Sequence, residues 1–198
     1  MRLPRSDVWW SRRVAPRGLL LVGLLAVTLI LARCGAEREC SCPEGKVLDQ
    51  QLMLVLATAR ALHHQADLQL QQGDVEQAKA TVGQILALDL SSRWPEAEEV
   101  RLDAVARLAK LLLGQSREDE ALATVDRGLQ GAQRESFYLS NLHAVRGEIL
   151  EQRSKRLERE GDKDQARRAA REAIAAFERS ITINKKLQQQ LSRQEGRP

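Results

Sequence analysis

The stretch GDVEQAKATVGQIL, residues 73–86, decides the fold class. Its apolar residues Ala78, Val82 and Ile85 recur at spacings of four and three residues. That spacing places them on one face of an α-helix. Asp74, followed by a glutamine three residues later, is typical of a helix N-terminus. The stretch therefore predicts a turn followed by a short amphipathic helix that packs through one face.

The same organisation extends over the following residues. A start signal at 41–44 combines Ser, Pro and Glu, and helical spacing then continues almost to the end, interrupted by short turns. Six helices are expected: 43 to Gly73, Asp74 to about Leu90, Pro95 to Gly114, Ser116 (capping with Asp119) to about Gly131, Ser136 to Glu160, and Lys163 to about Leu191. Turns of two to five residues favour antiparallel neighbours, so we expect three hairpins.

Composition agrees with this prediction. Of 198 residues, 43% are hydrophobic, 29% are charged and only 3% are aromatic. These values are typical of a folded chain, and the scarcity of strand formers favours helices. The length suits one domain plus a leader.

The net charge of +4 belongs to the first 42 residues. They hold seven basic and three acidic residues, which leaves 24 of each sign from the totals of 31 and 27. The helical part is therefore neutral overall and lacks the uniform basic surface of a nucleic-acid-binding protein. The mixed-charge run from Arg153 to Arg171 is interpreted as a solvated hairpin end rich in salt bridges.

The three hairpins are similar to one another. Ala78, Ala121 and Ala166 follow successive turns at intervals of 43 and 45 residues. In the last hairpin a second register is open, one that uses Ala173, Phe177, Ile181 and Asn184.

On these residues, the chain resembles the tetratricopeptide-repeat family over roughly residues 50–190. The best matches are GDVEQA at 73–78 and EAIAAF at 172–177, whereas the first helix of each hairpin matches less well. The period exceeds the ~34 residues of that family. Leu90 stands where a proline usually ends the unit, and the last hairpin is longer than the pattern.

The expected fold is all-α: three antiparallel helix hairpins stacked as a short tetratricopeptide-like right-handed solenoid, preceded by one N-terminal membrane helix. Each hairpin buries its apolar faces by stacking on the next. A plain helical bundle is the alternative. Close helix approach is expected at five small residues: Ala66, Ala78, Ala109, Ala121 and Gly147.

The N-terminal part predicts a membrane location. Residues 18–32 carry no charge and follow several arginines, a pattern typical of an export signal or an anchor. The favoured interpretation is an uncleaved single-pass anchor with a cytoplasmic N-terminus and an extracytoplasmic repeat domain, periplasmic in a bacterium. LARC, residues 31–34, resembles a bacterial lipoprotein signal, so lipidation at Cys34 is a second interpretation, and cleavage to a soluble form is a third.

The expected organisation has five parts. Residues 1–17 form a basic cytoplasmic segment, 18–33 the anchor or signal, 34–42 a linker that contains all three cysteines, 43–191 the repeat domain, and 192–198 a disordered tail.

We expect no enzyme, cofactor or metal site. His63 and His64 are adjacent, so they point about 100° apart on a helix and cannot chelate one metal together. No phosphate loop, nucleophile elbow or zinc-protease motif occurs in the sequence.

The resemblance implies that a protein partner binds in a concave groove formed by the first helix of each hairpin. The residues that it places there are Arg60, His63, Asp67, Leu70, Asp103, Lys110, Leu113, Asn141, Glu148 and Gln152. The predicted function is a membrane-tethered adaptor for protein–protein interaction in a cell-envelope complex. The alternative is a structural envelope protein or lipoprotein that associates with itself.

Overall fold

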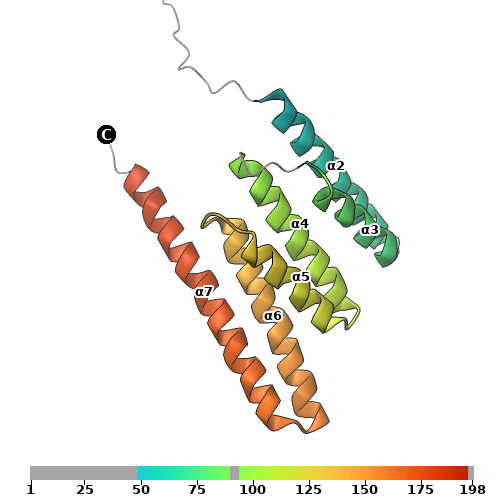
Figure 1. Cartoon of the computed structure of the whole chain (residues 1–198), viewed down its shortest axis with the longest axis vertical. Helices are drawn as coiled ribbons and strands as arrows, with labels where there is room; N and C mark the ends of the chain where they lie inside the picture. Colours follow the sequence, from blue (N-terminus) through green and yellow to red (C-terminus); the bar gives the residue numbers. More distant parts are fainter. Residues whose placement is uncertain (1–48, 90–93, 196–198) are drawn as a thin grey trace, which may run out of the picture. The chain divides into compact units, whose positions relative to one another are not determined.

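The computed structural model describes residues 49–89 and 94–195, and within them the protein is all-helical, with no strand. The six helices are α2 (Gln50–Gln71), α3 (Val75–Leu86), α4 (Pro95–Gly114), α5 (Glu118–Gln130), α6 (Phe137–Glu160) and α7 (Lys163–Glu195) (Figure 1). The all-α prediction is confirmed.

The chain divides into two units, Met1–Val47 and Leu48–Pro198, and the described helices all belong to the second. The predictions for the basic segment, the membrane segment and the cysteine linker with Cys34 lie outside the described residues. The first helix was expected from residue 43 but begins at Gln50, because the Asp49 side chain accepts from the backbone N–H of Gln51 and caps the helix there. Among the helices that are described, none is long and apolar enough to cross a membrane.

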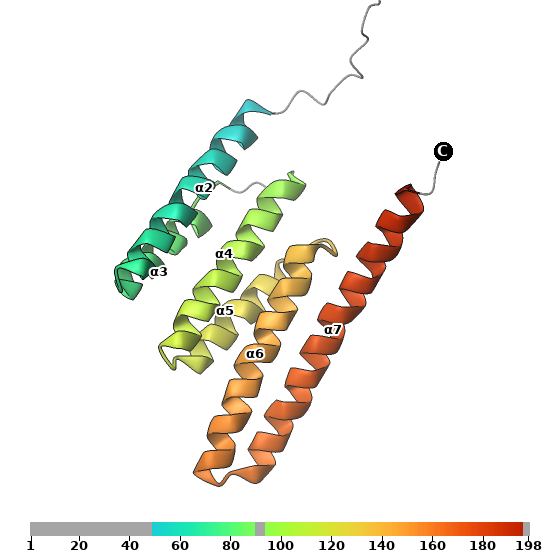
Figure 2. The same cartoon turned by 180° about the vertical axis from the view of Figure 1, so that it is seen from behind.

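Consecutive helices of the second unit pair with each other. α2 packs on α3, α4 on α5, and α6 most extensively on α7. Successive pairs then contact one another through α3 with α4 and α5 with α6, and also through α2 with α4 and α4 with α6 (Figures 1 and 2). The first helix of each pair therefore lies beside the first helix of the next.

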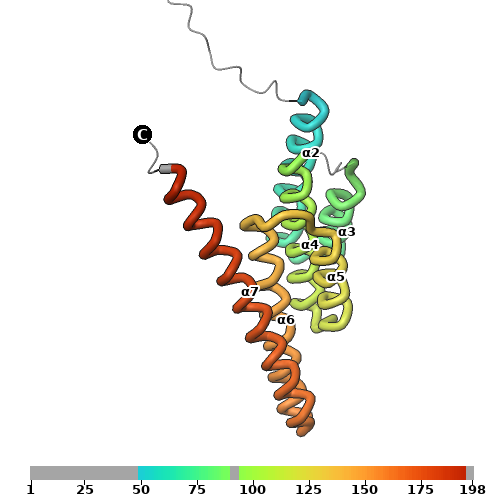
Figure 3. The backbone as a smooth tube through the Cα atoms, turned by 60° about the vertical axis from the view of Figure 1, so that its left-hand side comes forward, coloured from blue at the N-terminus to red at the C-terminus, as the bar shows by residue number. Residues whose placement is uncertain are grey.

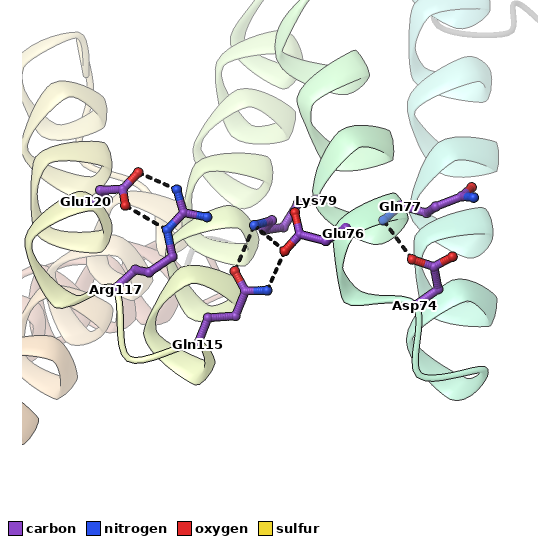
Figure 4. Close-up of polar contacts among 7 residues, drawn as sticks. All are labelled: Asp74, Glu76, Gln77, Lys79, Gln115, Arg117 and Glu120. Atoms are coloured by element: carbon purple, nitrogen blue, oxygen red, sulfur yellow. Dashed lines mark hydrogen bonds and ion pairs between the residues drawn. The ribbon is translucent and has the colours of Figure 1, made fainter.

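Side-chain caps fix the start of several helices. The backbone N–H of Gln77 donates to Asp74 at 3.0 Å, as the sequence predicted (Figure 4), and that of Gln165 donates to Asp162 at 3.0 Å. The prediction that Ser116 caps α5 is wrong. Ser116 has a φ of +60°, and Arg117, which makes no side-chain cap, is the N-cap residue.

The reason for this error is the geometry of the turn. Gly73 and Gly161 occupy the corresponding turns with φ of +81° and +88°. Ser116 thus takes the left-handed turn position, in which its hydroxyl cannot cap the following helix.

Two helix ends also differ from expectation. α3 ends at Leu86 rather than near Leu90. α7 continues to Glu195 instead of ending near Leu191, so four residues expected in the disordered tail are helical.

The small residues lie at the helix crossings that were predicted. Ala66, Ala78, Ala109 and Ala121 have no exposed surface. A Cβ atom on Gly147 would lie 2.7 Å from the ring of Phe177, so α6 and α7 approach too closely there for any larger side chain.

α6 and α7 pack through a continuous seam. The buried face of α7 repeats at alternating spacings of three and four residues and consists mostly of small side chains: Ala166, Ala169, Ala173, Ala176, Ser180 and Ile183. Such spacing is typical of coiled-coil packing, and small side chains let the two backbones approach closely (Figure 3). The sequence left two registers open for this hairpin, one that starts at Ala166 and one that uses Ala173 and Ile181. Ala166, of the first register, is buried. In the second register Ala173 is buried, but Ile181 is 51% exposed.

Polar side chains connect the hairpins at their turns. Lys79 of α3 donates to the Gln115 side chain at 2.7 Å, and Gln115 in turn donates to Glu76 at 2.6 Å (Figure 4). The buried carboxylate of Glu118 on α5 accepts from Arg156 of α6 at 2.9 Å. These contacts fix each pair of helices against its neighbour.

Candidate functional site: a groove between first helices

A groove of about 460 Å³ lies between α2 and the first half of α4. One residue of α6, Tyr138, contributes to its wall. The other lining residues are Leu56, Ala59, Arg60, His63, His64 and Asp67 from α2, and Glu96, Glu99, Val100, Asp103 and Arg107 from α4. The groove combines an apolar floor with charged walls, which is the composition of many recognition sites.

Ion pairs join neighbouring first helices along this side of the unit. Asp67 of α2 accepts from Arg107 of α4, and Lys110 of α4 lies 3.4 Å from Glu148 of α6. All four side chains are partly accessible to solvent. Each exposed pair contributes little to stability, about 0–1 kcal/mol, so their main effect is to hold the side chains in defined positions.

His63 is the most constrained polar side chain of the groove. Its Nε2 atom lies 3.4 Å from the Asp103 carboxylate, and its Nδ1 atom is buried with no hydrogen-bond partner in the described part of the chain. Burial lowers the pKa of His63 below 6.5, although Asp103 opposes this shift and Arg107 adds to it. Burial therefore favours the neutral imidazole of His63, whose Nδ1 atom is unsatisfied.

The structure brings four of the ten predicted binding residues to this groove: Arg60, His63, Asp67 and Asp103. Lys110 and Glu148 face each other further along the same side. Leu70 and Leu113 pack partly against the apolar core. Asn141 and Gln152 are half-buried on α6, away from the groove.

Several lining residues were missed by the sequence analysis, and helical spacing could have found some of them. Arg107 follows Asp103 by four residues, and Glu99 precedes it by four, so all three share one face of α4. Tyr138 had no such signal. It reaches the groove because α6 lies beside α4, a tertiary contact.

The groove carries an excess of negative charge near its mouth. Neither Glu96 nor Glu99 forms an ion pair with any described residue, and Arg60, on the facing helix, is likewise unpaired and exposed. Since Asp67 is neutralised by Arg107 and burial favours the neutral form of His63, the unpaired carboxylates outnumber the unpaired cation. The groove therefore favours a ligand that brings positive charge.

The basic run 153–171 is paired only in part. Arg153, Lys155 and Arg156 form ion pairs, with Asp119, Glu151, and both Glu118 and Glu160 respectively. The remaining basic side chains of the run are exposed and form no ion pair among the described residues: Arg159, Lys163, Arg167, Arg168 and Arg171. The predicted salt bridges thus occur at the start of the run only.

Within the described residues, no group of three or more His, Cys, Asp or Glu side chains is placed to hold a metal ion. No protein-family model matches this chain. No significant match to a curated protein was found either. A function for this chain is therefore inferred from the surface of its helical unit.

Proposed function

We propose that this chain is a membrane-tethered, extracytoplasmic adaptor whose helical repeats bind a segment of another protein in the groove between α2 and α4. In this proposal the three hairpins form a short tetratricopeptide-like solenoid. Its ligand is an extended or helical segment that carries basic residues.

The observation that supports this function best is the groove itself. It offers an apolar floor of Leu56, Ala59 and Val100, framed by the unpaired carboxylates of Glu96 and Glu99. An apolar anchor on the ligand would fill the floor, and lysine or arginine side chains would pair with the rim.

The tether rests on the sequence of residues 18–33. An uncharged segment that follows several arginines favours insertion with the N-terminus in the cytoplasm, which would place the repeats outside it. Protease added to spheroplasts should then digest the repeats. A Cys34→Ser variant distinguishes the two forms of attachment, because only a lipoprotein loses its lipid and changes electrophoretic mobility when that cysteine is replaced.

Site-specific photocrosslinking in the envelope tests the groove. A photoreactive residue at Arg60, with the full chain tagged at its C-terminus, should give a crosslinked partner band. The same probe at Arg127, on the exposed side of α5, should give none. A partner captured at Arg127 and not at Arg60 would contradict the groove.

Charge reversal then tests the chemistry of the ligand. The double variant Glu96→Lys/Glu99→Lys should reduce partner recovery about tenfold, because both carboxylates face the ligand without an internal partner. The matched control is Asp89→Lys/Glu158→Lys, which reverses two exposed acidic side chains outside the groove and changes the net charge by the same amount. Equal recovery from both double variants would exclude recognition by the acidic rim.

A further inference from the structure

The exposed side of α7 carries large apolar side chains that nothing in the described chain covers. Ile174 and Ile181, seven residues apart, are 57% and 51% exposed. Residues at that spacing share one face of a helix, and this face is distinct from the buried seam against α6. Leu191, 58% exposed, lies ten residues beyond Ile181.

The position of Ile174 has equivalents in the two preceding hairpins. In each hairpin a buried alanine follows the turn: Ala78, Ala121 and Ala166. Eight residues after these alanines lie Leu86, Leu129 and Ile174, respectively. Leu86 of α3 and Leu129 of α5 are partly buried against the core cluster formed by α4, α5 and α6. Ile174 thus occupies a stacking position whose partner helix does not occur in the described chain.

α7 also extends beyond the helix that supports it. The hydroxyl of Ser140 on α6 bonds to Ser180 of α7, which fixes the register of the pair. α6 begins only three residues before Ser140, whereas α7 continues for fifteen residues after Ser180, to Glu195. About three turns of α7 therefore project past the start of α6, and Leu191 is exposed in this part.

Two charged side chains lie beside the exposed Ile174 and Ile181 of α7, and they have opposite signs on the two sides of Ile181. Glu178 and Lys185 lie three residues before and four residues after Ile181, and neither forms an ion pair with any described residue. If two copies of α7 cross antiparallel at Ile181, Glu178 of each copy meets Lys185 of the other. Such an isologous contact closes on itself and contains each ion pair twice.

We propose that α7 is a dimerisation helix: two copies of this chain pair antiparallel through Ile174 and Ile181, with the two-fold axis near Ile181. The contact uses no residue of the groove, so each copy keeps its groove available. A dimer would then present two grooves to a partner, which increases avidity for a repetitive ligand.

The test is the mass of the full chain in detergent micelles, measured by light scattering under reducing conditions over a range of concentrations. The unaltered chain should be a dimer. Ile174→Ser/Ile181→Ser should raise the dissociation constant at least about tenfold, because it removes four apolar side chains from the centre of the interface. Both isoleucines are more than half exposed, so the dissociated variant should keep the helix content of the unaltered chain by circular dichroism.

Charge exchange tests the antiparallel register. Glu178→Lys or Lys185→Glu alone should weaken the dimer about fivefold, because each places like charges opposite one another twice. The double variant Glu178→Lys/Lys185→Glu should restore the original dissociation constant. Weakening by each single change without restoration by the pair would overturn this geometry.

The matched control is Leu54→Ser/Leu68→Ser, which removes two equally exposed side chains from α2, at the other end of the helical unit. The apolar segment 18–32 is unchanged in every variant, so any association through it is common to all. The proposal is wrong if the unaltered chain is a monomer, if the α7 variant is still a dimer, or if the α2 variant alone dissociates. The last result would indicate a contact through the α2 end.

Discussion

The first and the last hairpin solve the same packing problem in different ways. α2 and α3 have 22 and 12 residues, so α3 covers only part of α2. The first turns of α2 pack instead near the start of α4, where Leu52, Trp94 and Ala97 form a separate cluster. α6 and α7, with 24 and 33 residues, bury one continuous seam between them.

This difference explains where the groove lies. The half of α2 that α3 leaves uncovered faces the start of α4, and Arg60, Glu96 and Glu99 line the space between them. In the last hairpin α6 and α7 stay paired along α6, and a space of about 420 Å³ lies between them only near their turn, beside Ser154, Glu158 and Ala166. Unequal helix lengths thus place the candidate site at the first hairpin, where part of α2 lacks a partner in α3 and faces α4 instead.

The largest change in stability is expected from a substitution that disrupts the packing of α6 against α7. Gly147→Leu should destabilise the protein by about 3 kcal/mol, because its Cβ alone would lie 2.7 Å from the Phe177 ring. The matched change in the first hairpin is Gly83→Leu on α3, where an added Cβ meets nothing within 4 Å. That variant should gain about 0.5–1 kcal/mol from helix propensity.

Urea unfolding followed by circular dichroism measures both free energies of unfolding. If Gly147→Leu is as stable as the unaltered chain, the close approach of α6 and α7 is incorrect.

A smaller effect is expected at the crossings of the first two hairpins. Ala78→Leu or Ala121→Leu should cost roughly 1–3 kcal/mol, because both side chains are fully buried where helices cross. The exposed Ala57→Leu on α2 is the control and should change stability little. Thermal melts that are unmoved by both core substitutions would show that these alanines do not lie at crossings.

The turns allow a stabilising prediction. Ser116→Gly should raise the free energy of unfolding by about 1 kcal/mol, since its φ of +60° is strained for any residue with a Cβ atom. Gly73→Ser and Gly161→Ser, at the equivalent turns of the first and last hairpins, should each lower it by a similar amount.

Chemical unfolding of the three variants would show whether the turns are equivalent. A destabilised Ser116→Gly protein would mean that the serine hydroxyl has a structural role in the middle turn.

The smallest effect concerns pH. Burial lowers the pKa of His63 on α2 and of His143 on α6 below 6.5, and Arg179 and Arg146 add to the shift at His143. The unfolded chain therefore binds protons more readily than the folded one, so stability should fall as the pH drops from about 7.5 through 6.5 and level off below the folded pKa values.

Urea midpoints between pH 7.5 and 5 measure this dependence. His63→Gln and His143→Gln should each flatten the profile. A wild-type midpoint that rises as the pH falls through this range would contradict the direction of both shifts.

Much of the helical architecture could be predicted from the sequence because its determinants are local. The spacing of Ala78, Val82 and Ile85 and the cap at Asp74 are short-range features, and the structure places these residues as expected. The error at Ser116 is also local in origin. A serine before an acidic run favours a cap, and only the backbone conformation of the turn assigns it the left-handed position.

The groove was predictable only in part. Helical periodicity places Arg60, His63 and Asp67 on one face of α2, but it does not say which neighbouring helix that face meets. Leu70 and Leu113 illustrate the limit: they share the predicted face, yet they lie against the core because their ends of the helices are closely packed.

The sequence by itself determined the helices, most of their ends, and the alanines and glycine at the crossings, because side-chain periodicity and turn residues act over a few positions. Tertiary structure decided how far each helix covers its neighbour. That arrangement brings Asp67 to Arg107 and Tyr138 to the groove, and it leaves Ile181 exposed. Those features depend on contacts between residues about 40 or more positions apart, which no local pattern encodes.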